Sequence, residues 1–180
     1  MTTPEHRGGS ESSGANEARD TAAPPGVVFD CNLFLQAAIR EAGPAFACVN
    51  RLETGVYILY LSQAVLDEIR EVLGRPALQR KFPLLTPPRT AALLERIQRQ
   101  AVFVQNVPHV FDYDRDPKDV IYVDLAVAAG ARYLVSRDRD LLDLMDPNRA
   151  EARNFRQRFP GLAVLDPVNF LQNRPVPDAG

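Results

Sequence analysis

Short apolar runs alternate along the chain with longer stretches of helical periodicity. The runs have the length and aliphatic or aromatic character of buried strands, and they cover 27–29, 56–61, 101–104, 131–135 and 162–165. Between the second and third runs, Val65, Ile69 and Val72 recur at helical spacing. Alternating strands and helices predict an α/β fold, a three-layer α/β/α sandwich with a mostly parallel central sheet.

Start and stop signals bound the predicted helices. The helix after the first run ends at Gly43-Pro44, and Ser62 is a suitable N-cap for the helix that Gly74 closes. A helix that begins at Lys118 or Asp119 continues to Ala129 and ends at Gly130. Further helical segments are predicted at 45–51, 90–100 and 141–145, with a mixture of helix and loop over 75–88 and a turn from 166.

Composition divides the chain into a domain and two tails. Residues 1–25 are rich in Gly, Ser, Thr, Ala, Pro and charged side chains, so they bury too little apolar surface to offset the entropy of ordering. The Pro-rich residues 173–180 are a second tail by the same reasoning. Residues 26–172 are predicted to form one domain.

Net charge and cysteine content limit the class of protein and the cellular compartment that the sequence allows. The net charge of −2 excludes a globally basic, nucleic-acid-coating protein but allows a local basic patch, and Arg75, Arg80, Lys81 and Arg89 lie close in sequence. Two cysteines do not make a disulfide framework, which favours a reducing cytoplasmic location. No apolar run approaches the ~20 residues of a membrane span, and the charged N-terminus does not resemble a secretory signal.

Four acids share one position relative to the predicted sheet. They lie at strand ends or in helices that start there: Asp30, Glu68, Asp119 and Asp138. The carboxyl ends of parallel strands meet at one edge, where ligands bind. Clustered carboxylates repel one another, so the fold needs a cation or a proton to compensate them. Oxygen ligands without histidine or thiolate suit Mg²⁺ or Mn²⁺, and such a site favours phosphodiester hydrolysis.

Each acid taken alone has a simpler interpretation. Asp119 suits the dipole at a helix start, Asp138 suits a surface turn, and Glu68 suits a solvated helix face. Asp30 is the least ordinary, because an acid directly after a buried strand needs a partner.

Three blocks resemble the PIN-domain ribonucleases, and most closely the bacterial branch that supplies toxins of toxin–antitoxin pairs. The blocks are 27–32, 62–69 and 116–119 together with 130–142. They are an aliphatic strand followed by Asp and Asn, a Ser with a Glu in the next helix, and an acid before an apolar helix that leads to Ser-Arg-Asp. The resemblance covers about residues 26–172.

The resemblance implies a Mg²⁺- or Mn²⁺-dependent endonuclease that hydrolyses single-stranded RNA. Asp30, Glu68, Asp119 and Asp138 would be its catalytic, metal-binding quartet, with Asp116 a competitor for the third position. The implied supporting residues are Asn32 beside the first acid, Ser62 at the second strand's end, and Ser136 near the fourth acid. Cys31 stands where the family usually has Thr, and a thiol is a weaker hydrogen-bond partner.

Substrate contacts are assigned to basic and aromatic residues. Arg137 and Arg139, which flank Asp138, are the predicted RNA contacts. Tyr113 or Phe111 would stack on an unpaired base, with core packing the other role for Phe111. His109 is interpreted as an ordinary loop residue.

Two other functions and two partners are also considered. One function is a non-catalytic PIN-fold module that binds RNA or protein. The other is phosphotransfer with Asp30 as the nucleophile. Enzymes of that kind typically have a second acid two residues after the nucleophile, and here that position is Asn32. A toxin role implies a cognate antitoxin protein. The apolar stripes at 33–35 and 93–97 would serve either a homodimer or the core.

Overall fold

A five-stranded sheet forms the centre of the domain. The computed structural model describes residues 23–113 and 115–173, so most of the predicted tails, 1–25 and 173–180, lies outside the described residues. The strands are β1 (Gly26–Phe29), β2 (Ile58–Leu61), β3 (Ala101–Phe103), β4 (Tyr133–Val135) and β5 (Ala163–Leu165). Their order is β3-β2-β1-β4-β5, and every pairing is parallel. The predicted parallel α/β architecture is confirmed.

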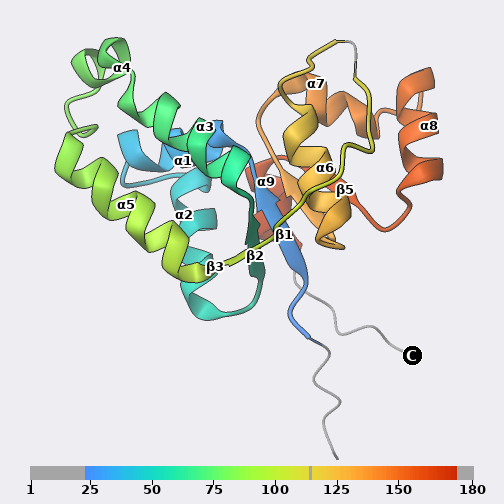
Figure 1. The fold of residues 1–180 in the computed structure, drawn as a ribbon, viewed down its shortest axis with the longest axis horizontal. Helices are drawn as coiled ribbons and strands as arrows, with labels where there is room; N and C mark the ends of the chain where they lie inside the picture. The colour runs from blue at the N-terminus through green and yellow to red at the C-terminus, as the bar shows by residue number, and fades with distance from the viewer. Residues whose placement is uncertain (1–22, 114, 174–180) are drawn as a thin grey trace, which may run out of the picture.

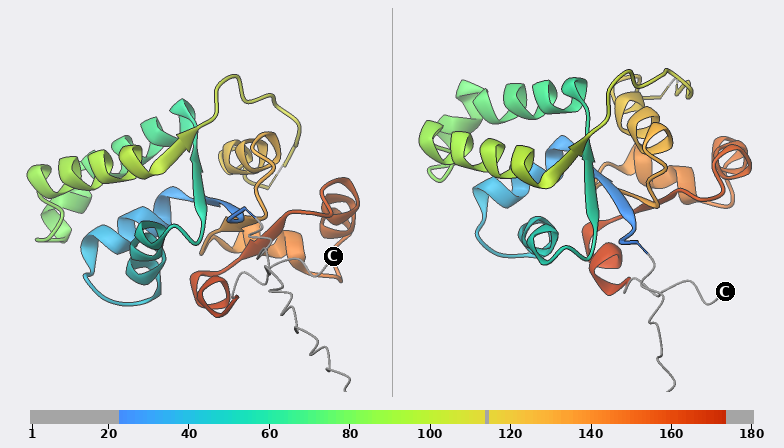
Figure 2. Two further views of the ribbon diagram at one scale, coloured as in Figure 1. Left: turned by 90° about the horizontal axis from the view of Figure 1, so that it is seen from below. Right: turned by 60° about the horizontal axis from the view of Figure 1, so that its bottom comes forward.

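Helices flank the sheet on both sides (Figures 1 and 2). One side carries α1 (Cys31–Ile39), α2 (Pro44–Arg51), α3 (Gln63–Gly74), α4 (Pro76–Lys81) and α5 (Pro87–Gln100). The other carries α6 (Val120–Ala128), α7 (Arg139–Leu142) and α8 (Ala150–Arg158). The 3₁₀ turns are η1 (Leu52–Thr54) and η2 (Asp143–Met145), and α9 (Pro167–Gln172) packs against α2.

The chain changes direction across the sheet at β1. From β1 it moves outward through β2 to β3, then crosses back by α6 to β4 on the other side of β1. Such a reversal opens a crevice at the carboxyl ends of the two central strands, which is where open α/β sheets bind ligands. In the register, Phe29 is opposite Val135, so the next residues, Asp30 and Ser136, come to lie side by side.

Several element boundaries differ from the sequence prediction. The first helix ends at Ile39, before the predicted Gly43-Pro44, and it begins directly at Cys31 because the Asp30 carboxylate caps it by accepting the Leu33 N–H at 2.7 Å. Helix α5 begins at Pro87, since proline suits the first turn of a helix. Helix α8 was not predicted, because only Ala152 and Phe155 on it are buried and so sparse a stripe shows no periodicity.

The core takes up residues that had other predicted roles. Phe111 and Tyr113 are only 5% and 6% exposed and stack on each other, so the prediction that one of them stacks on an RNA base is wrong. Leu33 and Ile97, from the two stripes considered for a homodimer, are buried in the core. Among the helices of the described ranges, none combines the length and apolar character that crossing a membrane requires.

Candidate active site

Asp30 and Ser136 form the floor of the candidate site. Asp30 follows β1 and is 2% exposed. One carboxylate oxygen accepts the Leu33 N–H, and the other accepts the hydroxyl of the fully buried Ser136. Burial raises the pKa of Asp30 from 3.8 to about 6, although both hydrogen bonds act in the opposite direction. The strand register therefore holds a carboxyl group where ionisation is costly.

Asp119 occupies the electrostatic centre of the site. It precedes α6, and its Oδ2 is buried with no hydrogen-bond partner in the described structure. Burial, and after it the negative charges nearby, raise its pKa from 3.8 to about 7. In order of effect these charges belong to Asp138, Asp116, Asp30 and Glu68. The fold thus brings all four acids of the predicted quartet within electrostatic reach of one another.

Tyr122 fixes Glu68, which lies in the second turn of α3. The buried Tyr122 hydroxyl donates to a Glu68 carboxylate oxygen and accepts the Cys31 N–H at 3.1 Å. Because Tyr122 is on α6, this hydroxyl ties together α1, α3 and α6, the helices that follow or carry Asp30, Glu68 and Asp119. Sequence reasoning missed Tyr122, although a tyrosine in an apolar helix one turn after an acid needs a polar partner.

Asp138 and Asp116 stabilise the backbone around the site. Asp138 is half-buried and caps α7, since its Oδ1 accepts the Asp140 N–H at 2.8 Å. Its own N–H donates to Ser136 Oγ at 2.8 Å, which links it to Asp30 through one hydroxyl. Asp116 Oδ1 accepts the Lys118 N–H at 2.9 Å and closes the turn before Asp119. Asp119 is the one of the two with an orphaned buried oxygen.

The predicted supporting residues fall into different places. Ser62 is buried and caps α3, with its Oγ 3.4 Å from the Val65 nitrogen. Asn32 is exposed on the first turn of α1, and within the described residues the hydroxyl that bonds Asp30 belongs to Ser136. The Cys31 thiol is buried beside the Tyr122 hydroxyl, and burial raises its pKa to about 12, so it stays protonated at neutral pH.

The two predicted RNA contacts lie exposed at the rim. Arg137 donates to Gln36 Oε1 at 2.7 Å, which turns it toward α1. Arg139 is the first residue of α7 and points into solvent. Neither forms an ion pair within the described part of the chain, so both guanidinium groups remain available to an anion.

A buried acid that sequence reasoning missed holds the loop between β3 and α6. Asp124, in the middle of α6, accepts the N–H groups of Val110 and Phe111 at 2.9 and 3.0 Å. Its other oxygen lies 2.8 Å from His109 Nδ1, and His109 Nε2 lies 3.0 Å from Asp112. These hydrogen bonds raise the pKa of His109. His109 is therefore part of a loop anchor and not the ordinary loop residue predicted.

The donor set suits a hard divalent cation. Within residues 23–113 and 115–173, no three acidic, histidine or cysteine side chains are already arranged to hold a metal ion. The quartet nevertheless offers only carboxylate oxygens, forms no ion pair with a described basic side chain, and includes the orphaned Asp119 Oδ2. A cation would offset both the burial and the repulsion that raise the pKa values of Asp30 and Asp119.

Open α/β sheets bind ligands at the switch point, and carboxylates gathered there suit an enzyme of metal-assisted hydrolysis. The family model for the PIN domain matches residues 26–140, most of the chain, and the chain belongs to the PIN-domain family. Proteins of this family are commonly nucleases and generally use divalent metal ions. No curated protein and no solved structure matches the chain.

Proposed function

We propose that this protein is a divalent-metal-dependent endoribonuclease that hydrolyses phosphodiester bonds of single-stranded RNA. The observation that carries the proposal is the buried, unpartnered Asp119 Oδ2 at the switch point of the sheet, with four further carboxylates within electrostatic reach of Asp119. Membership of the PIN-domain family supports nuclease chemistry in general. The Mg²⁺ or Mn²⁺ requirement is supported by the all-carboxylate donor set.

The four acids would hold the ion, and their neighbours set their positions. When bound, Mg²⁺ or Mn²⁺ supplies positive charge to the phosphodiester and makes water easier to deprotonate. Ser136 and the Leu33 N–H fix the Asp30 carboxylate, and Tyr122 fixes Glu68. With a pKa of about 7, Asp119 is only about half ionised at neutral pH, and a bound cation would favour its ionised form. Arg137 and Arg139 would bind the phosphates next to the reacting one.

The biological setting is proposed from the resemblance to PIN-domain toxins. In that setting the protein acts in the cytoplasm as the toxin of a toxin–antitoxin pair, and a cognate antitoxin protein covers the acidic edge. A homodimer is compatible with that role, but the buried Leu33 and Ile97 would not form its interface. Identification of an adjacent reading frame whose product suppresses the nuclease would test the setting.

One observation favours a second function, a non-catalytic PIN-fold module that binds RNA or protein. It is the lack of a ready-made ligand group among the described side chains. Phosphotransfer through Asp30 has no such support. Both oxygens of Asp30 accept hydrogen bonds, and the carboxylate is 98% shielded from solvent, so it is poorly placed to attack a phosphate.

An RNA cleavage assay with and without Mg²⁺ or Mn²⁺ separates these functions. The wild type should cleave a single-stranded oligoribonucleotide only with metal, and Asp30→Asn and Glu68→Gln should be inactive although folded by circular dichroism. Asp67→Asn is the matched control, since Asp67 is the exposed neighbour of Glu68 on α3 and pairs with Arg70 at 2.9 Å. Full activity of Asp30→Asn would contradict the proposal, and RNA binding without cleavage would favour the second function.

A further inference from the structure

A groove opens beside Arg137, next to the acidic edge. It has a volume of about 450 Å³, and it lies between the end of α1, the turn into α2, the end of α4 and the segment after β4. Its lining includes Gln36, Ile39, Arg40, Phe82 and Arg137. An adjoining hollow of about 360 Å³ shares Arg137 and Pro44 with it. We call the larger space, with these five residues, the α1 groove.

One face of α1 connects the acidic edge to this groove. The helix starts directly after Asp30, and Asn32, Gln36 and Arg40 follow at intervals of four residues, so they share one face. The span from Asn32 to Arg40 is about 12 Å at the rise of an α-helix. Arg137 bonds Gln36 midway along this face.

The groove carries positive charge that the described protein does not neutralise. Arg40 and Arg137 line it, and the ammonium of Lys81 lies 5.4 Å from the centre of the ring of Phe82, which is part of the lining. In the described part of the chain, none of the three cations pairs with a carboxylate. By contrast, Arg75 and Arg89 of the basic cluster noted in the sequence pair with Glu71 and Glu41. Among the described residues, three unpaired cations therefore gather at the α1 groove.

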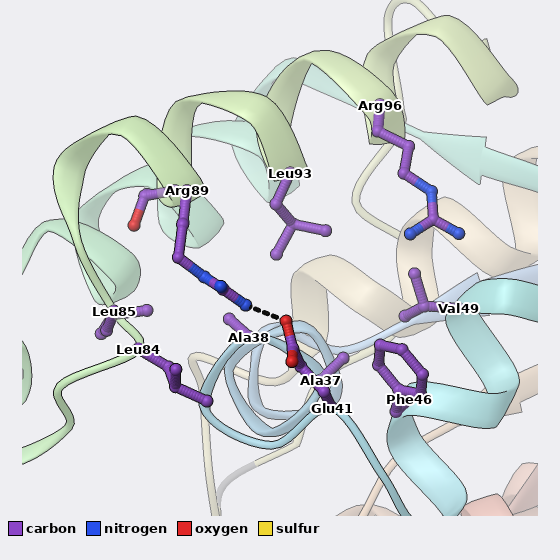
Figure 3. A pocket seen from close by; sticks show the side chains of 11 residues that line it. Ala37, Ala38, Glu41, Phe46, Val49, Leu84, Leu85, Arg89, Leu93 and Arg96 are labelled. Carbon is purple, nitrogen blue, oxygen red and sulfur yellow. Dashed lines mark hydrogen bonds and ion pairs between the residues drawn. The ribbon is translucent and has the colours of Figure 1, made fainter.

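Another pocket of the domain lacks these properties. It holds about 170 Å³ between α1, α2 and α5, and Glu41 pairs with Arg89 across it (Figure 3). Its floor is apolar, with Phe46 and Leu93 in the wall. Arg96, the second arginine of its lining, pairs with Glu53 at 2.8 Å. Because both arginines are already neutralised by carboxylates, this pocket does not attract a polyanion.

We propose that the α1 groove binds the single-stranded RNA on one side of the cleaved bond. Phosphates contact Arg40, Arg137 and Lys81, while unpaired bases pack on the half-buried Ile39 and Phe82. A duplex would hide the base faces that this apolar lining accepts. The inference rests on the proposed ribonuclease function and adds the path of the substrate to it.

Binding measured without cleavage tests the groove by itself. In the Asp30→Asn background, fluorescence anisotropy follows a labelled single-stranded oligoribonucleotide of about ten nucleotides. Arg40→Glu and Lys81→Glu should each weaken binding by about tenfold and reduce the slope of log K against log salt by about 0.7. The control, Arg156→Glu on α8, makes the same charge change on the other side of the sheet and should alter binding less than about twofold, because salt screens distant charges.

The results distinguish failure of the groove from failure of the ribonuclease proposal. If Arg40→Glu and Lys81→Glu bind the RNA with the same affinity as the Arg156→Glu control, the assignment of the α1 groove as the RNA-binding site is wrong. Tighter binding of the matched DNA strand or of an RNA duplex would also contradict that assignment. In the otherwise wild-type enzyme, Arg40→Glu should raise KM more than it lowers kcat. Metal-dependent cleavage with an unchanged KM overturns the groove alone. Groove-dependent binding without any cleavage overturns the ribonuclease proposal alone. Thermal unfolding confirms that each exposed substitution leaves the fold intact.

Discussion

Two groups of acids lie near each other in the fold and differ in what compensates their charge. The first is the candidate quartet, which has no basic partner in the described residues. The second is Asp140, Asp143 and Asp146, in and just after α7. Arg115 pairs with Asp140 and, at 3.0 Å, with Asp143, and Arg149 pairs with Asp143 at 2.8 Å. We call this second group the α7 ion-pair cluster.

The difference separates structural acids from candidate functional ones. In the α7 ion-pair cluster, Arg115 anchors the loop before α6, and the Tyr113 hydroxyl reinforces this by donating to the Asp140 carbonyl at 2.8 Å. The quartet instead retains raised pKa values at Asp30 and Asp119, a cost that the folded protein leaves uncompensated. Such uncompensated acids in a crevice are candidates for function.

The largest expected effect is on cleavage. Asp119→Asn should lower metal-dependent RNA cleavage by about 10³-fold or more, as loss of a catalytic acid does in other enzymes. Asp140→Asn makes the same chemical change in the α7 ion-pair cluster and should keep most of the activity. Single-turnover cleavage rates at saturating Mn²⁺ provide the comparison. Equal losses of rate in the two variants would contradict the claim that the quartet is functional and the α7 ion-pair cluster is structural.

A smaller loss is expected when Tyr122 is replaced by Phe. The ring fills the same space in the core, but the hydroxyl that holds Glu68 and the Cys31 N–H is lost. Cleavage and Mn²⁺ affinity should both fall by about 10- to 100-fold, the usual effect of a group that orients a metal ligand. Tyr113→Phe is the matched control because its hydroxyl bonds only in the α7 region. A normal Mn²⁺ affinity for Tyr122→Phe would contradict the assigned role.

Stability without metal should fall as the pH rises from about 4 to 7. The folded protein keeps protons on Asp30 and Asp119 up to pH values of about 6 and 7, whereas the unfolded chain releases them near 3.8. The unfolded state therefore binds fewer protons in this window, and the free energy of unfolding decreases with pH. The shift of Asp30 alone corresponds to about 3 kcal/mol.

Urea unfolding with EDTA at several pH values measures this slope. Asp119→Asn should flatten it, and saturating Mn²⁺ should restore stability most strongly above pH 7, where the cation replaces the lost protons. Asp140→Asn should keep the wild-type slope. A stability that rises steadily from pH 4 to 7 in the wild type, and equally in Asp119→Asn, would show that the two carboxyl groups ionise without cost.

The smallest effect is expected in the α7 ion-pair cluster. Arg115→Ala removes the pairs with Asp140 and Asp143, and because these side chains are partly exposed the free energy of unfolding should fall only slightly. Mn²⁺ affinity should change little, since Arg115 contacts no member of the quartet. Thermal unfolding and Mn²⁺ titration of the same sample check both statements. A large loss of Mn²⁺ affinity would show that the α7 ion-pair cluster affects metal binding by the quartet.

The sequence was informative wherever position along a strand determines position in space. Asp30 and Ser136 follow strands that pair directly, so apolar runs and parallel topology suffice to place them at one edge. Tyr122 and Asp124 could not be placed in this way. They lie within an apolar helical stretch, and their partners Glu68 and Val110 come from segments that only the folded chain brings close. The α1 groove is also a property of packing, since α1, α4 and the segment after β4 meet only in three dimensions.

Calorimetric titration of Mn²⁺ at pH 8 tests the central claim most directly. The wild type and Asp140→Asn should bind the ion with the same affinity, and Asp119→Asn should lose at least about 10-fold in affinity. Cation binding by the quartet predicts this pattern. Equal affinity in all three proteins, or no binding by the wild type, would contradict it.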